Sequence, residues 1–157
     1  HAAIAAGQPA TPDGVTTAIR GVLTALGVDI SAAQILDASG LSAASKVPPA
    51  VLTATLRAAS QRADPMLRAA VTGLPVAAFS GTLADRFDGA AERAAAGWVR
   101  AKTGTLTGVS SLAGMTTAAD GHTYVFSFLA DAVGNGDAAR DALDRAAAAL
   151  TGCGCMG

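Results

Sequence analysis

The sequence contains few of the side chains from which most catalytic and binding sites are built. Its 157 residues include two lysines, two histidines, two cysteines, one asparagine, one tryptophan and one tyrosine. Neither histidine has metal-ligand spacing with a cysteine or a carboxylate, and Cys153 and Cys155, one residue apart, do not have the spacing of a zinc site. We therefore expect neither a metal nor a cofactor, and any chemistry must depend on a small number of residues.

Charge is equally scarce, because only 15% of the residues are charged and the net charge is −1. No basic run is present, so nucleic acid is not an expected partner. No apolar run approaches the ~20 residues that a membrane-spanning helix needs. With 51% hydrophobic residues, the composition favours one globular domain with a sizeable core over a disordered chain.

One stretch does combine a cation, hydroxyls and a glycine. Val99 to Thr105 has the pattern of a strand that carries Lys102, Thr103, Gly104 and Thr105. Strand periodicity places the two threonine hydroxyls on one face, with Gly104 between them, where a ligand can approach the backbone. A fixed cation, two hydroxyls and an open backbone N–H suit a carboxylate beside an electrophilic carbonyl.

The residues that follow predict an antiparallel sheet and a helix. Thr107-Gly108 is a turn signal, Val109–Thr117 is compatible with a strand, and Asp120-Gly121 is a hairpin signal. Thr123–Leu129 is the most β-prone run of the chain. An Ala-rich helix from Asp137 to Leu150, capped at Asp137, is expected to cover one face of the three strands.

Helices are expected in the first half of the chain. Thr11 is the predicted N-cap of a helix that ends at Gly27, since Pro12 follows it at the first helical position. The pattern predicts a buried face made by Val15, Ile19, Val22, Leu23 and Leu26. Pro48-Pro49 opens a second helix, and Asp64-Pro65 opens a third that ends at Gly73.

Three connecting segments complete the prediction. Ile30–Leu36 is expected to hold a short strand. The next segment, Asp37 to Ser42, has two interpretations: a turn whose side chains satisfy backbone groups, or a wall of a cleft beside Lys102. Residues 74–97 mix loop and short helix, and there we expect Arg86 to be a structural tether.

Residues 99–109, Val-Arg-Ala-Lys-Thr-Gly-Thr-Leu-Thr-Gly-Val, resemble the Lys-Thr-Gly signature of penicillin-binding proteins and serine β-lactamases. They are most similar to the type-4, class C low-molecular-mass penicillin-binding proteins, which are D-alanyl-D-alanine carboxypeptidases. Asp37–Ser42, and Gly81-Thr82-Leu83 with Arg86, fit the same family. The resemblance implies an α/β (α+β) fold, namely the C-terminal half of a transpeptidase-like domain with three antiparallel strands and flanking helices.

Two other signatures of that family have no match in this chain. In Ser-x-x-Lys the serine is the nucleophile and the lysine takes its proton, but Ala43 precedes Lys46 by three residues and Val99 precedes Lys102. The signature Ser-x-Asn also fails, because Val133 stands two residues before Asn135. We therefore expect residues 1–157 to be the C-terminal part of one DD-peptidase domain, inactive alone, whose N-terminal part with the nucleophile is absent.

The resemblance also implies the role of each site residue. Lys102 and Thr105 would be catalytic: the Lys102 charge holds the terminal D-Ala carboxylate, and the Thr105 N–H stabilises the oxyanion. Thr103 and Gly104 would bind the same end of the substrate, while Leu106, Thr107 and Ser39 would line its path. The relatives often carry an arginine at the position of Ala43, so recognition of an acidic side chain there is not predicted.

The implied partners are a peptidoglycan stem peptide ending in D-Ala-D-Ala, β-lactams, and the N-terminal portion of the same protein, all outside the cytoplasm. Without that portion, Thr123–Leu129 would leave an apolar strand edge unpaired. Two alternatives remain open. The chain is then either a non-catalytic fragment that binds wall peptides or a partner, or half of a serine β-lactamase.

Overall fold

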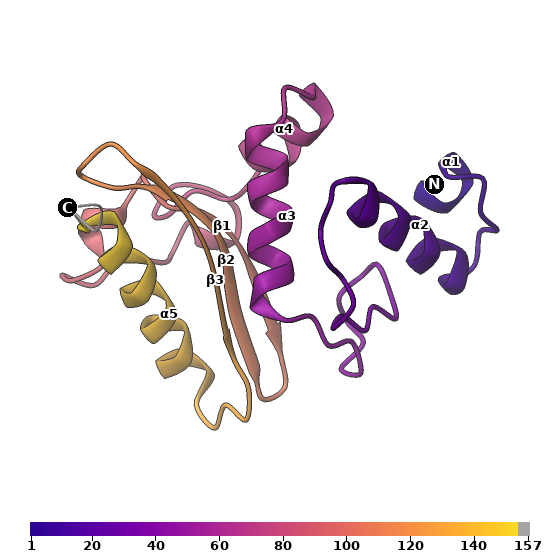
Figure 1. Ribbon diagram of the computed structural model, residues 1–157. Helices are drawn as coiled ribbons and strands as arrows, with labels where there is room; N and C mark the ends of the chain where they lie inside the picture. Colours follow the sequence, from indigo (N-terminus) through magenta and orange to yellow (C-terminus); the bar gives the residue numbers. More distant parts are fainter. Residues whose placement is uncertain (154–157) are drawn as a thin grey trace.

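The three predicted strands form one antiparallel sheet in the computed structural model, which describes residues 1–153. The strands β1 (Arg100–Leu106), β2 (Val109–Thr117) and β3 (Thr123–Ala130) lie in the order β1-β2-β3 (Figure 1). Their bounds differ from the predicted ones by at most one residue. The turn after Leu106 and the hairpin turn at Asp120-Gly121 occur where the sequence predicts them.

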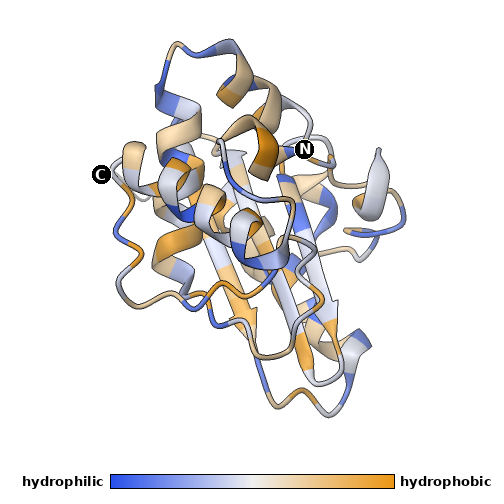
Figure 2. Ribbon diagram, turned by 90° about the vertical axis from the view of Figure 1, so that its right-hand side faces the viewer, coloured by the Kyte–Doolittle hydropathy of each residue, from blue (hydrophilic) through white to orange (hydrophobic). Residues whose placement is uncertain are grey.

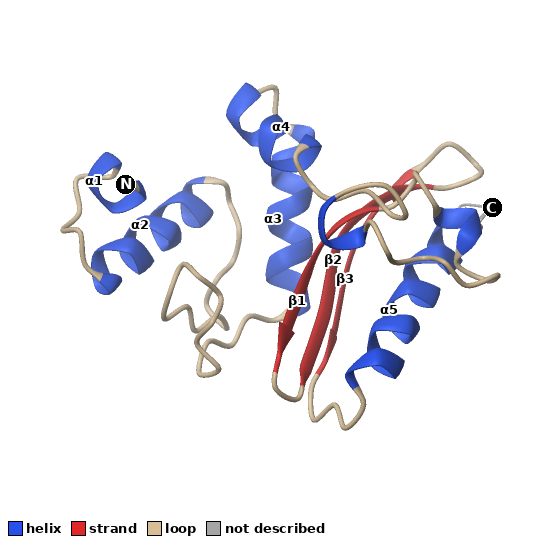
Figure 3. Ribbon diagram, turned by 180° about the vertical axis from the view of Figure 1, so that it is seen from behind, coloured by secondary structure: helices blue, strands red, loops and turns tan. Residues whose placement is uncertain are grey.

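Helices cover both faces of the sheet. The C-terminal helix α5 (Gly136–Thr151) packs on one face and α3 (Pro49–Gln61) on the other (Figures 1 and 3). Along β2, Ser110, Leu112, Gly114 and Thr116 alternate as buried residues, as period two requires. The face that they form is the one under α5, because the Thr116 and Thr151 hydroxyls hydrogen-bond there at 2.8 Å.

The main core lies between the sheet, α5 and the loop that precedes β1. Its buried side chains come from all three, which explains why a loop with little regular structure is held in place. They are Ala77, Leu83, Phe87, Ala95, Val99, Ala101, Leu112, Phe126, Leu143, Ala147 and Ala148.

The N-terminal helices α1 (Ala2–Ala5) and α2 (Pro12–Ala25) lie beyond α3, away from the sheet (Figure 1). The Thr11 hydroxyl accepts a hydrogen bond from the Gly14 N–H at 3.1 Å, which confirms the predicted cap. A second, smaller core joins α2 to α3 around Val28, Ala33 and Val51. Hydrophobic and hydrophilic positions are mixed along the helices on this side of the molecule (Figure 2).

Two predictions for this region are wrong. Val22 is 55% exposed, because only the side of α2 that carries Leu23 and Leu26 packs against the second core. Residues 30–36 form no strand, and only one isolated bridge pairs Gln34 with Lys46. Among the described residues no strand lies beside this segment to pair with it, so the segment forms a loop despite its β-prone residues.

The remaining elements follow the prediction except at one cap. Helix α4 (Pro65–Thr72) begins after Asp64, whose carboxylate accepts from the Met66 N–H at 2.8 Å. Short 3-10 turns η1 (Gly81–Leu83) and η2 (Arg93–Ala95) interrupt the long loop. The N-cap of α5 is Asn135 rather than Asp137, because the Asn135 amide oxygen accepts from two backbone N–H groups at 3.1 Å.

None of the helices that the structure describes is long and apolar enough to cross a membrane. The expectation for the two cysteines falls partly on Cys155, which lies outside the described residues.

Candidate active site at the open edge of β1

A loop segment pairs with the outer edge of β1 and covers only its first part. We call residues 75–83 the strap. The Ala77 N–H donates to the Val99 carbonyl and the Ala101 N–H donates to the Pro75 carbonyl, both at 2.9 Å. Val76 forms an antiparallel bridge with Arg100. Of the described residues, none pairs with the outer edge of β1 beyond Ala101.

This arrangement fixes the direction of the next backbone groups. In an antiparallel strand, the N–H and C=O of alternate residues point to the same side. The Ala101 N–H points outward to the strap, so the N–H groups of Thr103 and Thr105 also point outward, away from β2. The edge of β1 therefore presents two adjacent outward amides just where the strap ends.

Lys102 brings a positive charge to this edge. Its side chain is exposed, and its Nζ donates to the Thr103 carbonyl oxygen at 2.9 Å. The cross-strand partners show that Thr103, opposite Leu112, and Thr105, opposite Ser110, share the α5 face of the sheet, as predicted. Lys102 starts on the opposite face and reaches the edge because its side chain folds back onto the backbone.

Gly104 leaves room for a side chain of the neighbouring strand. A Cβ on this residue would lie 2.4 Å from the Ser111 Oγ on β2. The Ser111 hydroxyl occupies that space and donates to the Gly104 carbonyl at 3.4 Å. The glycine thus accommodates a cross-strand side chain, in addition to leaving the backbone open toward a ligand.

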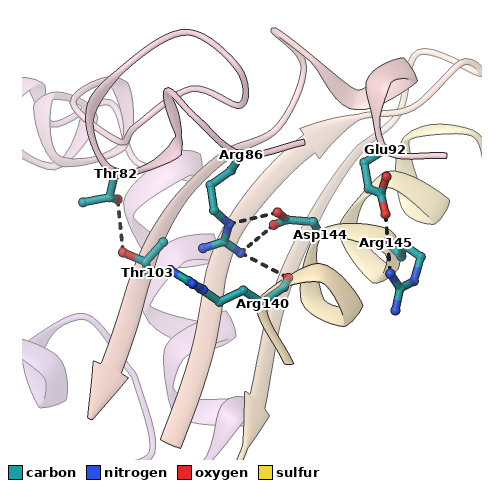
Figure 4. A network of polar contacts seen from close by, with 7 residues as sticks. All are labelled: Thr82, Arg86, Glu92, Thr103, Arg140, Asp144 and Arg145. Carbon is teal, nitrogen blue, oxygen red and sulfur yellow. Dashed lines mark hydrogen bonds and ion pairs between the residues drawn. The ribbon is translucent and has the colours of Figure 1, made fainter. Parts of the chain in front are cut away.

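Thr82 of η1 is a site residue that the prediction missed. The Thr103 hydroxyl donates to the Thr82 hydroxyl oxygen, with 3.1 Å between the two Oγ1 atoms (Figure 4). The sequence singled out Gly81-Thr82-Leu83 as part of a resemblance, but 21 residues separate the two threonines. No local pattern indicates that they meet.

A cavity of about 510 Å³ lies beyond the far end of the open edge. Leu106 and Thr107 line it on one side, while Ser42, Ser45 and Lys46 line it on the other. The segment after Asp37 therefore approaches the end of β1 near Leu106 and Thr107.

Ser39 is not among the residues that line this cavity. Its hydroxyl donates to the Asp37 carboxylate, which also accepts from the Leu41 N–H at 3.0 Å and the Ser45 hydroxyl at 3.1 Å. The hydrogen bond from Ser39 is the main reason why the pKa of Asp37 lies below its ordinary value. The Asp37 carboxylate thus satisfies backbone groups, as the turn interpretation predicts, while Ser42 at the end of the same segment lines the cavity.

Two ion pairs fasten the loop before β1 to α5 (Figure 4). The Arg86 guanidinium binds the Asp144 carboxylate through two hydrogen bonds, Nε to Oδ2 at 2.9 Å and Nη2 to Oδ1 at 2.6 Å. The same guanidinium donates to the Arg140 carbonyl at 3.3 Å, and Arg145 lies 3.7 Å from the Glu92 carboxylate. Arg86 is therefore the tether that the sequence predicts.

The groups gathered at this edge suit an anionic ligand. Among the residues that the structure describes, no three His, Cys, Asp or Glu side chains gather in a way that could hold a metal ion. The donors that gather at the edge are one ammonium, two hydroxyls and the outward N–H groups, and they lie beside the outward carbonyl of Thr103, which accepts from Lys102.

A protein-family model described as the D-Ala-D-Ala carboxypeptidase 3 (S13) family matches residues 1–150. The chain belongs to this family. It is 41% identical over 152 residues to carboxypeptidase DacB of Mycolicibacterium smegmatis, and 39% identical over 155 residues to a carboxypeptidase of Mycobacterium tuberculosis. These matches cover 96% and 98% of this chain, but 33% of each relative, so this S13 chain spans about a third of their length.

Solved structures give the same assignment for this S13 chain. Penicillin-binding protein 4 (dacB) of Haemophilus influenzae matches with a TM-score of 0.75 and 28% identity, over 89% of this chain and 32% of that one. Its complex with a novel β-lactam matches with a TM-score of 0.80 and 27% identity, over 92% of this chain and 34% of that one. The resemblance to penicillin-binding proteins of type 4 and the expected transpeptidase-like fold are thereby confirmed.

Proposed function

We propose that this chain is the C-terminal part of a serine-type D-Ala-D-Ala carboxypeptidase or endopeptidase that cleaves peptidoglycan stem peptides. The observation that carries the proposal is the open edge of β1, where Lys102 and the outward amides of Thr103 and Thr105 lie together. Membership of the S13 family supports the choice of substrate class.

In this proposal the catalytic work is divided between two parts of one domain. The N-terminal part supplies the serine, whose oxygen attacks the carbonyl of the penultimate D-Ala while a lysine accepts its proton. The bond to the terminal D-Ala then breaks, the leaving amine takes up a proton, and an acyl-enzyme remains. Water hydrolyses that ester in a second step.

This chain would hold the substrate during both steps. The terminal carboxylate lies near the Lys102 ammonium and accepts hydrogen bonds from the Thr103 and Thr105 hydroxyls. The Thr105 N–H donates to the oxyanion, and losing such a donor typically costs ~10²–10³ in rate. Leu106 and Thr107 flank the rest of the peptide, since they line the adjoining cavity.

The open edge of β3 supports the proposed second part. Thr123–Ala130 pairs with β2 on one side only, and no other described strand pairs with its outer edge. Such an edge readily accepts another strand, so we propose that the N-terminal portion completes the sheet there. Alone, the chain should aggregate or pair with a second copy. Its elution as a stable, folded monomer would count against this arrangement.

The same anion site would bind penicillins, whose carboxylate and strained carbonyl resemble the peptide end, and the complete protein would act outside the cytoplasm. Labelling with a fluorescent penicillin tests the predicted binding. A polypeptide that joins this chain to an N-terminal portion with Ser-x-x-Lys and Ser-x-Asn should be labelled covalently, whereas this chain alone should not. Absence of labelling in the joined polypeptide would favour a non-catalytic, peptide-binding role.

Lys102→Ala in the joined polypeptide should lower the second-order rate constant of labelling about 10- to 100-fold, because a charged hydrogen bond to the carboxylate is lost. The matched control is Arg68→Ala, which removes one exposed cation from α4, far along the chain from the site. Equal labelling of the Lys102 variant and the parent would contradict the assigned role.

A further inference from the structure

The contact between Thr82 and Thr103 has a consequence for substrate binding. A hydroxyl has one proton and two lone pairs, so it can donate only one hydrogen bond at a time. The Thr103 proton is directed at the Thr82 oxygen, at an Oγ1–Oγ1 distance of 3.1 Å. A carboxylate at the open edge needs that same proton.

The two hydroxyls can resolve this competition without moving apart. When the Thr103 proton turns to a carboxylate, no proton remains between the two oxygens, and the Thr103 oxygen can accept the proton of the Thr82 hydroxyl. The hydrogen bond between them then reverses, and Thr103 becomes a donor to the ligand and an acceptor from Thr82.

The fold holds Thr82 firmly enough for this task. Its neighbour Leu83 is fully buried in the main core, and the Leu83 carbonyl accepts from the Ala78 N–H at 2.9 Å. Backbone hydrogen bonds of Ala77 and Ala101 hold the strap against the start of β1. Gly81 turns the chain with a φ of +58°, a conformation that other residues adopt only with strain.

We propose that Thr82 is a positioning residue that fixes the Thr103 hydroxyl and reverses its hydrogen bond when a carboxylate binds. This inference rests on the proposed function, because it concerns the anion that the site would take. Thr82 does not touch the reacting carbonyl in this proposal. Its effect should therefore fall on recognition of the carboxylate, and leave the chemistry of acylation unchanged.

The test compares benzylpenicillin with its methyl ester, whose carboxylate charge is removed, in the joined polypeptide. Their rate constants of acylation are measured by competition with a fluorescent penicillin. Thr82→Val keeps the shape of the side chain but cannot donate, so the ratio of acid to ester rate constants should fall about 3- to 10-fold. Thr82→Ser restores the donor and should restore the ratio.

Thr72→Val is the matched control, since the Thr72 hydroxyl bonds only the backbone of its own helix and lies on α4. It should leave the ratio unchanged. Equal slowing of acid and ester by Thr82→Val would leave the ratio unchanged, show a general structural defect and overturn the inference. Unchanged rate constants for both compounds would overturn it as well. A parent polypeptide that reacts with neither compound would instead overturn the proposed function itself.

Discussion

Breaking the ion pair between Arg86 and Asp144 by a single substitution should cost much of the free energy of unfolding. Only 13% of the Arg86 side chain and 5% of the Asp144 side chain are exposed, and the two are joined by a bidentate contact. Removing one partner leaves the other charge buried without compensation, which typically costs about 3–5 kcal/mol. Asp144→Ala should therefore lower the free energy of unfolding by roughly that amount.

Urea unfolding of the joined polypeptide, followed by circular dichroism, would measure this effect, because the midpoint concentration of urea falls in proportion to the lost free energy of unfolding. The matched control is Asp137→Ala, which removes the exposed i,i+3 pair with Arg140 on the same helix. That change should cost less than about 1 kcal/mol.

A double variant tests whether the cost comes from the buried charge that is left without its partner. Arg86→Leu combined with Asp144→Leu removes both charges, and its loss of stability should be smaller than that of either single change. Additive losses, or a loss for Asp144→Ala no larger than that for Asp137→Ala, would refute the reasoning. Either result would mean that water reaches the pair and screens it.

Three further predictions follow from the fold and the loops. Gly114→Ala should lower the free energy of unfolding by about 1–3 kcal/mol, measured by urea denaturation, because its Cβ would lie 2.1 Å from the Arg100 carbonyl oxygen; unchanged stability would show that the sheet can relax there. Asn135→Ala should cost about 1 kcal/mol in the same assay through loss of the α5 cap, while Asn135→Asp should cost much less. Ser39→Ala should raise the pKa of Asp37 toward its ordinary value of 3.8, as followed by NMR titration. Because the native pKa is depressed, the stabilisation from Asp37 is present above pH 3.8 and is lost as the pH falls through the lowered pKa, so acid unfolding of Ser39→Ala should begin at a higher pH. Identical titration curves for the Ser39 variant and the parent would contradict this assignment.

The sheet and most helix starts could be predicted from the sequence because their signals are local. Alternation along Val109–Thr117, the Asp120-Gly121 turn, and the cap-then-proline pairs at Thr11 and Asp64 each depend on neighbouring residues only. The α5 cap was wrong by two residues because Asn135 and Asp137 are both good capping residues, and the pattern alone does not choose between them.

The less predictable parts depend on contacts between distant segments. The strap lies beside β1 because Leu83 is buried and Ala77 pairs with Val99, and neither contact leaves a periodic trace in the sequence. The position of Thr82 therefore became evident only in three dimensions. The exposure of Val22 has a similar cause, since helical spacing identifies an apolar face but not whether anything packs against it.

The place where the strap stops has a consequence for selectivity. With the edge of β1 blocked as far as Ala101, an extended peptide that lies along it has only a very short length of backbone to pair with. Under the proposed function, the share of the affinity that this chain contributes then comes mostly from the charged end of the peptide rather than from pairing with its preceding residues. As far as this edge decides, peptides that differ upstream but share the same last residue would bind almost alike, whereas a terminus without its charge would lose the main contact.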